Sequence, residues 1–391
     1  MKIAMYMKGM HRPGGVGSYL TRISALLRSA GHEVILLDLV GESTAPGAGI
    51  TYVETEADVP RVAHGAGADL LHTHILLTFA GRSPLPVIRT IHNHDAYCPS
   101  GSRFLHTLGR PCDRTYSVSG CTWGHLVNHC GSVRPGVMLD EFRRTRAELK
   151  HTRALTALAV SDFVRVQMLR AGYDAARVHL LPLPAPAPRP WQALSEDRIP
   201  RFLFLGRLTP QKGVDWLIRA ASQVTREIAI DIAGTGHPLR EKEYRDLSEK
   251  LGLSARVTFH PWLGGTAVEA MLARARALVF PSIWHEPAGL VGLEAMTGGR
   301  AVIAGRVGGI PEIVSDGEGG LLVDPGDVNQ LAAAIDRLAD DAHLAEKMGR
   351  VGQRIAAERF SADAHLARLM EAYEKEIAAF GSGISMATGV Q

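Results

Sequence analysis

Short apolar runs alternate with longer amphipathic segments along almost the whole 391-residue chain. Runs rich in Val, Ile and Leu predict strands near residues 2–7, 33–39, 50–54, 69–74, 86–92 and 155–161, and then near 202–208, 228–234, 256–261, 277–282 and 301–306. Helical patterns such as those at 17–32 and 213–227 lie between them. Alternation of this kind predicts an α/β fold with parallel sheets covered on both faces.

A proline-rich stretch divides the alternating pattern in two. Prolines at 182, 184, 186, 188, 190 and 200 favour extended backbone and cannot continue a central strand. We therefore expect two doubly wound domains that face a central cleft, where such sheets bind ligands. The predicted parts are an N-terminal domain (1–185), a linker (186–199), a C-terminal domain (200–365) and a C-terminal helix and tail (366–391).

Composition and charge exclude several classes of protein. The chain is 46% hydrophobic and 21% charged, with a formal net charge of +3. It has no extended Lys/Arg block, so nucleic-acid binding has no support. No apolar run approaches the length of a membrane span, and the N-terminal run is broken by Lys8 and His11, too early for a signal peptide. The cytoplasm, including the inner face of the membrane, is the expected location.

The segment FPSIWHEPAGLVGLEAM is a strand, a loop with Glu286, and a helix that begins near Gly289 and carries Glu294. The backbone N–H groups of Gly289, Leu290 and Val291 are predicted at the helix start, which suits a phosphate group. Two carboxylates at the same place require a ligand that also carries hydroxyls, as sugars and ribose do. One capping and one solvated glutamate would produce the same pattern.

Three further segments place polar groups after strands. In FLGRLTPQKG, Arg207 and Lys212 are two cations that can neutralise a diphosphate, although loop cations are more often solvated. In HRPGGVGSYL, Gly15 permits a close backbone approach at a helix start. His92 ends the strand PVIRTIH at its carboxyl edge, where a single histidine is more often structural than catalytic.

Together these segments resemble the retaining glycosyltransferases of family 4, which have the GT-B fold. The resemblance rests on GGVGSYL, TIHN, GRLTPQKG, the Glu286-x7-Glu294 pair and GGRAVIAGRVGGIPEIV, in the family's order over roughly the whole chain.

The resemblance implies a role for each of these residues. Arg207 and Lys212 would hold the diphosphate of a UDP- or GDP-sugar, Glu286 the transferred sugar, and Glu294 the ribose. Gly289, Leu290 and Val291 would bind phosphate and sugar through their amides, and Gly15 and Val16 would approach the diphosphate from the other domain. His92 would lie beside the anomeric carbon. The resemblance thus implies a catalytic set of His92, Glu286, Arg207 and Lys212.

The implied reaction is transfer to an acceptor hydroxyl with retention, in which the leaving phosphate accepts the acceptor's proton. No D-x-D motif occurs in the sequence, so catalysis is expected to need no metal ion or other cofactor.

Three other functions remain open. An NDP-sugar epimerase would use similar phosphate contacts without an acceptor, and a non-catalytic GT-B subunit would bind nucleotide or support a partner enzyme. A dinucleotide-dependent dehydrogenase is suggested by GGVG and Asp38, but Leu20 stands where its third glycine belongs. The acceptor is equally open. The cationic segment FRRTRAELKHTR would suit a lipid-linked acceptor and peripheral membrane contact. The same segment could instead be a solvated surface helix, and the acceptor a small molecule.

All four cysteines of the chain lie within a 33-residue insertion, at Cys98, Cys112, Cys121 and Cys130. The intervening thirteen, eight and eight residues are not the short spacings of common zinc sites. An insertion without its own core still needs something to order it. We expect a structural zinc ion, with an iron–sulfur cluster or two disulfides as alternatives.

Overall fold

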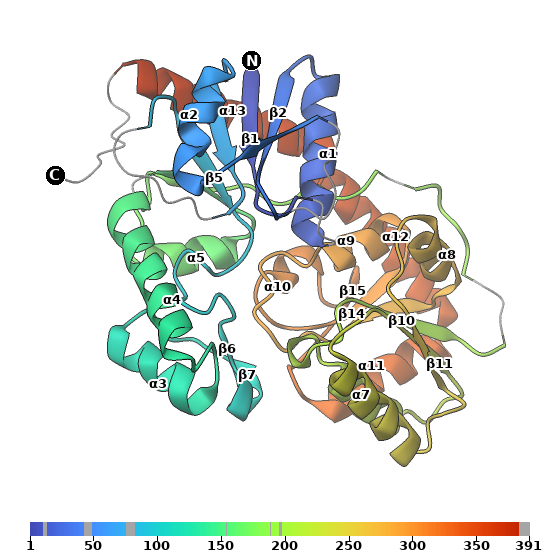
Figure 1. Cartoon of the computed structure of the whole chain (residues 1–391). Helices are drawn as coiled ribbons and strands as arrows, with labels where there is room; N and C mark the ends of the chain where they lie inside the picture. The colour runs from blue at the N-terminus through green and yellow to red at the C-terminus, as the bar shows by residue number, and fades with distance from the viewer. Residues whose placement is uncertain are drawn as a thin grey trace. The chain divides into compact units, whose positions relative to one another are not determined.

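The computed structural model describes residues 1–10, 14–42, 49–75, 83–153, 155–187, 189–194 and 198–382. The chain forms two compact units, which Figure 1 shows coloured along the sequence. The first unit comprises Met1–Thr107, Cys112–Leu183 and Ala362–Gln391, and the second comprises Leu108–Pro111 and Pro184–Ser361. The second unit thus begins within the proline-rich stretch.

The first unit contains a seven-stranded parallel sheet. Its strand order is β3-β2-β1-β4-β5-β8-β9, and each strand is parallel to its neighbours. Its strands are β1 (Lys2–Tyr6), β2 (Glu33–Leu39), β3 (Ile50–Val53), β4 (Leu70–Thr73), β5 (Val87–Ile91), β8 (Thr156–Ala159) and β9 (Val178–Leu180). The helices α1 (Gly15–Ser29), α2 (Val59–Gly65) and α5 (Asp162–Arg170) connect them.

The cysteine-bearing segment lies between β5 and β8. It contains the short strands β6 (Phe104–Leu105) and β7 (Arg110–Pro111), then helices α3 (Val118–Asn128) and α4 (Pro135–Ala147). A π-helical turn at Glu148–Thr152 leads into β8. Ser117 caps α3 by accepting a hydrogen bond from the N–H of Gly120.

The second unit contains a six-stranded parallel sheet in the order β12-β11-β10-β13-β14-β15. Its strands are β10 (Arg201–Leu205), β11 (Ala229–Ala233), β12 (Val257–His260), β13 (Ala277–Phe280), β14 (Ala301–Gly305) and β15 (Gly320–Val323). Its helices are α6 (Val214–Ala221), α7 (Pro238–Lys250), α8 (Thr266–Arg274), α9 (Leu290–Thr297), α10 (Ile310–Ile313), α11 (Val328–Asp340) and α12 (Ala342–Arg359).

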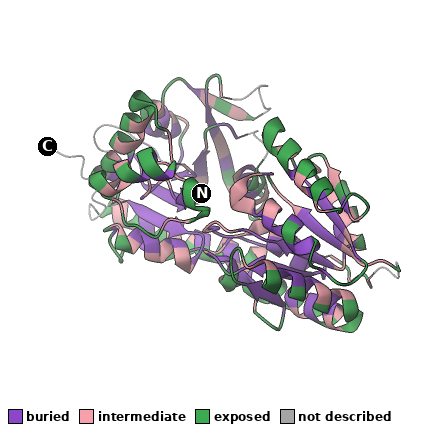
Figure 2. Cartoon of the chain, turned by 90° about the horizontal axis from the view of Figure 1, so that it is seen from below, coloured by how far each residue is buried: buried purple, intermediate pink, exposed green. Residues whose placement is uncertain are grey.

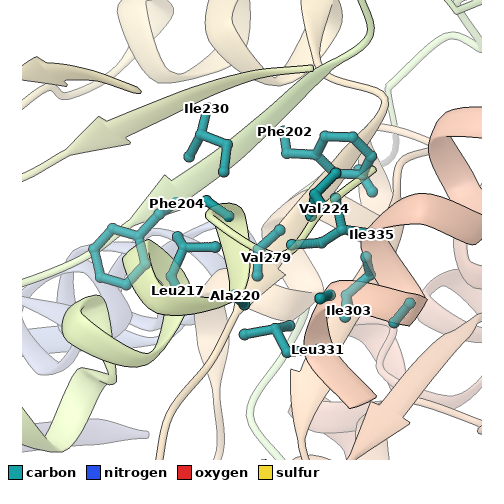
Figure 3. Close-up of a cluster of buried hydrophobic side chains, with 14 of the residues drawn as sticks. Phe202, Phe204, Leu217, Ala220, Val224, Ile230, Val279, Ile303, Leu331 and Ile335 are labelled. Atoms are coloured by element: carbon teal, nitrogen blue, oxygen red, sulfur yellow. The ribbon is translucent and has the colours of Figure 1, made fainter. Parts of the chain in front are cut away.

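Alternate residues of each strand point to opposite faces of this second sheet. Side chains on both faces are buried. Phe202 and Phe204 of β10 pack in one cluster with α6 and α11, as Figure 3 shows for Leu217 and Leu331. Leu203, between the two phenylalanines, packs in a second cluster with side chains of α9 and α12. The predicted α/β class with two Rossmann-like domains is confirmed, and every strand predicted above is present.

Two strands of the large parallel sheets, β9 and β15, were not predicted, and neither were the two-residue strands β6 and β7. β9 is a three-residue edge strand with two exposed side chains, and β15 follows a glycine-rich turn, so neither has the long apolar run that the pattern requires.

The C-terminal helix α13 (Ala362–Gly381) belongs to the first unit. Leu369 and Tyr373 are fully buried, and the hydroxyl of Tyr373 lies 2.7 Å from Nδ1 of His72 in β4. Thr156 of β8 donates a hydrogen bond to Oε2 of Glu376 at 2.6 Å. The helix therefore completes the packing of the first sheet.

Candidate functional site

Two neighbouring strands of the second unit lead into the loops that carry the predicted donor-binding residues. β10 ends at Leu205 and β13 ends at Phe280, and the two strands pair in parallel. The carbonyl oxygen of Gln211 accepts hydrogen bonds from the N–H of Ile283 (3.0 Å) and from Oγ of Ser282 (3.1 Å). These bonds hold the two loops against each other at the carboxyl edge of the sheet.

Lys212 and Glu286 form an ion pair across these loops. Nζ of Lys212 lies 2.5 Å from Oε1 of Glu286, and Oγ of Ser282 donates to the same oxygen at 2.6 Å. Glu286 is 5% exposed, and the rings of Phe280 and Trp284 lie 5.7 and 5.5 Å from the ammonium nitrogen. Attraction between opposite charges is stronger in such a poorly solvated place than in water. The arrangement can therefore present one cation and one carboxylate to a single ligand.

Two glycines make this loop packing possible. A Cβ built on Gly213 would lie 1.9 Å from the carbonyl oxygen of Pro281, and Gly213 has a φ of 68°. A Cβ on Gly308 would lie 2.3 Å from the carbonyl oxygen of Glu286, which accepts a hydrogen bond from the N–H of Gly309 at 2.7 Å. A side chain at either position would displace the loop that carries the ion pair.

The remaining predicted residues of the second unit surround the start of α9. Gly289 caps the helix with a φ of 78°, and Leu290 and Val291 are its first two residues. Glu294 is half-buried one turn further along, and Arg207 is exposed in the loop after β10. The structure thus brings the predicted phosphate-binding backbone and the two carboxylate-bearing segments to one strand–helix junction.

Gly15 and Val16 begin α1 directly after the loop that follows β1. Of this loop, residues 11–13 lie outside the described part of the chain. The buried carboxylate of Asp38 accepts hydrogen bonds from the N–H groups of Gly9 (2.8 Å) and Met10 (3.0 Å). Asp38 therefore holds the backbone at Gly9 and Met10, ahead of Gly15 in the sequence. In a dehydrogenase, an aspartate at this position would instead bind the ribose of the dinucleotide.

His92 follows β5 at the carboxyl edge of the first sheet and contacts a second histidine. Its Nε2 lies 3.1 Å from Nδ1 of His74, which follows β4. The ring of Tyr19 in α1 lies 5.0 Å from the ring of His92 and 5.6 Å from that of His74. The orientation of His92 is therefore set by its neighbours on β4 and α1.

The histidine cluster extends into the C-terminal helix. Nδ1 of His365 lies 2.8 Å from the carbonyl oxygen of Pro182, which can only accept, so Nδ1 donates. In the neutral ring Nε2 then accepts from the hydroxyl of Tyr19 at 3.1 Å. The sequence reading missed His72, His74 and His365. His74 did carry a signal in the sequence, because it is the last residue of a predicted strand, as His92 is.

We expect this cluster to make the protein less stable in acid. Burial lowers the pKa of His365 to about 4 and that of His92 to about 3, and it holds the pKa values of His72 and His74 well below their usual range. An unfolded histidine has a pKa of about 6.5, so only the unfolded state takes up protons just below that pH. The free energy of unfolding should fall as the pH drops, by about 2 kcal/mol at about pH 5 for a group such as His365.

Urea unfolding at a series of pH values checks this expectation. The variant His365→Gln, which lacks one of these titrating rings, should show a shallower dependence on pH than the parent protein. A free energy of unfolding that is constant between about pH 7 and about pH 5 would contradict the assignment of neutral buried rings.

All four cysteines line one cavity of about 20 Å³ in the first unit, together with Arg103 among others. Each is a free thiol, and burial raises the pKa of Cys130 to about 12 and raises those of Cys98 and Cys121. Within the described part of the chain, no group of three or more His, Cys, Asp or Glu side chains has metal-binding geometry. The four cysteines of the predicted zinc site therefore line one cavity, but their side chains are not arranged as metal ligands.

The chain is similar to several proteins of known class. The family model "Glycosyl transferases group 1" matches residues 190–355. An alpha-maltose-1-phosphate synthase of Mycolicibacterium smegmatis is 34% identical over 353 residues, which cover 85% of this chain and 86% of that protein. A D-inositol 3-phosphate glycosyltransferase of Streptomyces griseus is 34% identical over 228 residues, or 56% of this chain, and the match spans only 43% of that relative's length.

Solved structures resemble the whole chain in fold. A sucrose-phosphate synthase from Thermosynechococcus elongatus superimposes with a TM-score of 0.71 at 20% identity and covers 97% of this chain and 99% of that one. Anabaena HepE in complex with UDP-glucose gives a TM-score of 0.67 at 19% identity and covers 96% of this chain and 100% of that one. Both likenesses extend over the two units.

Proposed function

Because the chain belongs to the glycosyl transferases group 1, the retaining family 4 with the GT-B fold, we propose that it transfers a sugar from a nucleotide-diphosphate sugar to an acceptor hydroxyl. The observation that carries the proposal is the Lys212–Glu286 pair, which Ser282 fixes beside the start of α9. This place offers a cation, a carboxylate and helix N–H groups to one ligand, as a sugar diphosphate requires.

Each predicted residue has a place in this proposal. Lys212 and exposed Arg207 neutralise the diphosphate, and the amides of Leu290 and Val291 bind its oxygens. Glu286 accepts hydrogen bonds from hydroxyls of the transferred sugar, and Glu294 accepts them from the ribose. In the first unit, Gly15 and Val16 offer backbone to the diphosphate.

His92 orients the sugar. With its pKa lowered to about 3 by burial, it acts as a neutral ring.

The bonds exchanged in the reaction follow from these roles. The bond between the anomeric carbon and the diphosphate oxygen breaks, and the acceptor oxygen bonds to the same face of that carbon. The acceptor's proton passes to the departing phosphate. Lys212 and Arg207 stabilise the negative charge that grows on this phosphate in the transition state. Because both cations are already in place before the reaction, they lower the activation barrier without a cost for reorganisation.

We propose UDP-glucose as the first donor to test, because a structure of the same fold was solved with that compound. Donor turnover is expected to continue when EDTA is added at the start of the assay and to gain nothing from Mg²⁺ or Mn²⁺. The release of UDP in the presence and absence of candidate acceptors measures this. An absolute need for either ion would contradict charge stabilisation by Lys212 and Arg207.

The same assay separates the rival functions. Release of UDP that depends on an acceptor supports transfer. Conversion of the donor to another UDP-sugar without release would indicate an epimerase, and binding without turnover would indicate a non-catalytic subunit.

Replacing Glu294 with alanine is expected to weaken donor binding more than it slows the chemical step. A hydrogen bond to a charged group contributes roughly 1.5–3 kcal/mol, so the Kd for the donor should rise about 10- to 150-fold. Calorimetric titration of UDP measures the change, and Glu249→Ala, an exposed glutamate of α7, is the control. Unchanged UDP affinity in the Glu294 variant would remove the ribose assignment.

For the acceptor, we propose a lipid-linked molecule at an anionic membrane surface. Large apolar side chains of α3, of the loop after it and of the start of α4 are 43–59% exposed, and Figure 2 colours the exposed residues of the chain green. They are Val118, Trp123, Leu126, Val127, Val133, Val137 and Leu139. Residues 98–153 also contain nine Lys or Arg and four Asp or Glu, a surplus of five positive charges in a chain whose total is +3. An apolar face with surrounding positive charge suits the interface of an anionic bilayer.

No helix in the described part of the chain is long and apolar enough to cross a membrane.

Co-sedimentation with lipid vesicles tests the membrane surface. The protein should bind vesicles that contain phosphatidylglycerol, release them at high salt and bind phosphatidylcholine vesicles weakly. The double change Trp123→Ser/Leu126→Ser should abolish binding, whereas Leu239→Ser on α7, which is 67% exposed, should not. Absence of binding to anionic vesicles would favour a small soluble acceptor.

A further inference from the structure

Four cysteines from four different local structures meet at one cavity in the first unit. Cys98 lies in the loop after β5, Cys112 directly follows β7, Cys121 is in the first turn of α3, and Cys130 follows the end of α3. All four line the same cavity of about 20 Å³.

Backbone hydrogen bonds fix where each cysteine stands. The N–H of Cys98 donates to the carbonyl oxygen of His94 at 2.9 Å, and the carbonyl of Cys98 accepts from Gly101, also at 2.9 Å. The N–H of Cys112 donates to the carbonyl of Arg103 at 2.7 Å. Gly101 has a φ of 63°, a left-handed conformation that permits the tight turn after Cys98.

The end of α3 is built to place the fourth cysteine. His129 adopts a left-handed conformation with a φ of 51°, and the N–H of Cys130 then donates back to the carbonyl of Gly124 at 3.2 Å. A Cβ on Gly124 would lie 3.0 Å from Sγ of Cys130, so a larger residue there would push the sulfur away. The helix end therefore directs Cys130 toward the cavity.

The segment has too few buried apolar side chains to order itself. Residues 98–130 are all described, and besides Pro99 only Phe104 and Leu105 are buried hydrophobic residues among them. A chain piece of this size with so little core is normally held by disulfides or a metal ion. The ordering element must lie where its residues converge, which is the cysteine cavity.

We propose that Cys98, Cys112, Cys121 and Cys130 bind a single zinc ion as four thiolates. The proposal does not depend on the proposed function, since no donor or acceptor takes part. The small cavity suits one ion better than an iron–sulfur cluster, because Zn–S bonds of about 2.3 Å in a tetrahedron need little more space than the sulfurs themselves. Binding draws the four sulfurs inward from where they line the cavity.

Charge on the surrounding residues favours zinc over neutral disulfides. When zinc binds, four S–H bonds break, four S–Zn bonds form, and four protons leave to solvent, so the site carries two net negative charges. Arg103 and Arg114 both line the cavity, and Arg103 is 5% exposed. Nε of Arg103 donates to the carbonyl of Cys112 at 3.0 Å, and Nη1 of Arg114 donates to that of Gly120 at 3.2 Å. Two cations at this place favour the net negative charge of a zinc tetrathiolate over neutral disulfides.

The metal content of the purified full-length protein tests the proposal. Elemental analysis should find about one zinc ion per chain, and a thiol reagent should find no reactive cysteine until a strong chelator or denaturant is added. Cys112→Ser and Cys121→Ser should each lose most of the zinc, whereas Thr115→Ala, an exposed position in the same segment, should keep it.

Cobalt exchange gives a second readout that needs no variant. Co²⁺ loaded in place of zinc should show thiolate-to-metal charge-transfer absorption, which bound solvent or carboxylate does not give. Four reactive thiols without metal, two disulfides, or iron with inorganic sulfide would each overturn the proposal. Failure of sugar transfer would leave these results unchanged, so the two proposals fail separately.

Discussion

Replacing Lys212 with methionine is expected to lower kcat for sugar transfer by roughly two to three orders of magnitude. Methionine keeps much of the length and apolar volume of the lysine stem but removes the charge that faces the departing diphosphate. The KM for the donor should rise less than kcat falls, because the charge on the phosphate is greatest in the transition state. Single-turnover transfer from UDP-glucose measures both quantities.

A second variant separates this catalytic effect from a structural one. Lys212→Met alone leaves the carboxylate of Glu286, 5% exposed, without its cation, so the melting temperature should also fall. Adding Glu286→Gln removes the stranded charge and should restore most of the stability but none of the activity. Lys242→Met, on the exposed face of α7, should change neither. Recovery of transfer in the double variant would show that Lys212 serves the fold alone.

The largest loss of stability is expected from Glu148→Ala. Glu148 pairs with Arg89 of β5 in the interior of the first unit, where the two side chains are 3% and 1% exposed. Glu148 also accepts hydrogen bonds from the hydroxyls of Tyr173 (2.7 Å) and Thr152. Removing it leaves a buried guanidinium without its counter-charge, which typically costs about 3–5 kcal/mol.

Urea unfolding of the full chain, followed by a probe in the first unit, measures this loss. The double variant Arg89→Met/Glu148→Leu, which removes both charges, should be more stable than Glu148→Ala. Glu346→Ala, which breaks an exposed pair with Arg350 on α12, should cost less than about 1 kcal/mol. Equal losses from Glu148→Ala and Glu346→Ala would show that the interior pair contributes no more than a surface pair.

The strands and the donor-side loops could be predicted because their signals are local. β10 and β13 are buried on both faces and therefore appear as continuous apolar runs, and Lys212 and Glu286 follow them within a few residues. The contact between those two side chains depends on the adjacency of β10 and β13 in the sheet. Lys212 and Glu286 are 74 residues apart in sequence, and the parallel pairing that brings them together leaves no local mark in the sequence.

Apart from His92 and His74, the histidine cluster could not be predicted for the same reason. His365 meets Tyr19 across 346 residues of sequence, and Tyr373 meets His72 across 301. The amphipathic pattern of α13 predicts a buried face but does not say which sheet will cover it. The cysteines were conspicuous in the sequence, yet only the end of α3 and the turn at Gly101 show how their spacing leads to one cavity.

The return of α13 to the first unit has a consequence for folding during synthesis. The ribosome makes residues 184–361 before it makes the helix whose Tyr373 and Glu376 contact β4 and β8. The second unit is complete in sequence at residue 361, so it can fold while the first sheet still lacks one of its covering helices. The unit that is translated first is therefore the last to complete its fold. A chaperone that shields exposed strands would have to stay bound to this unit for longer than to the second one.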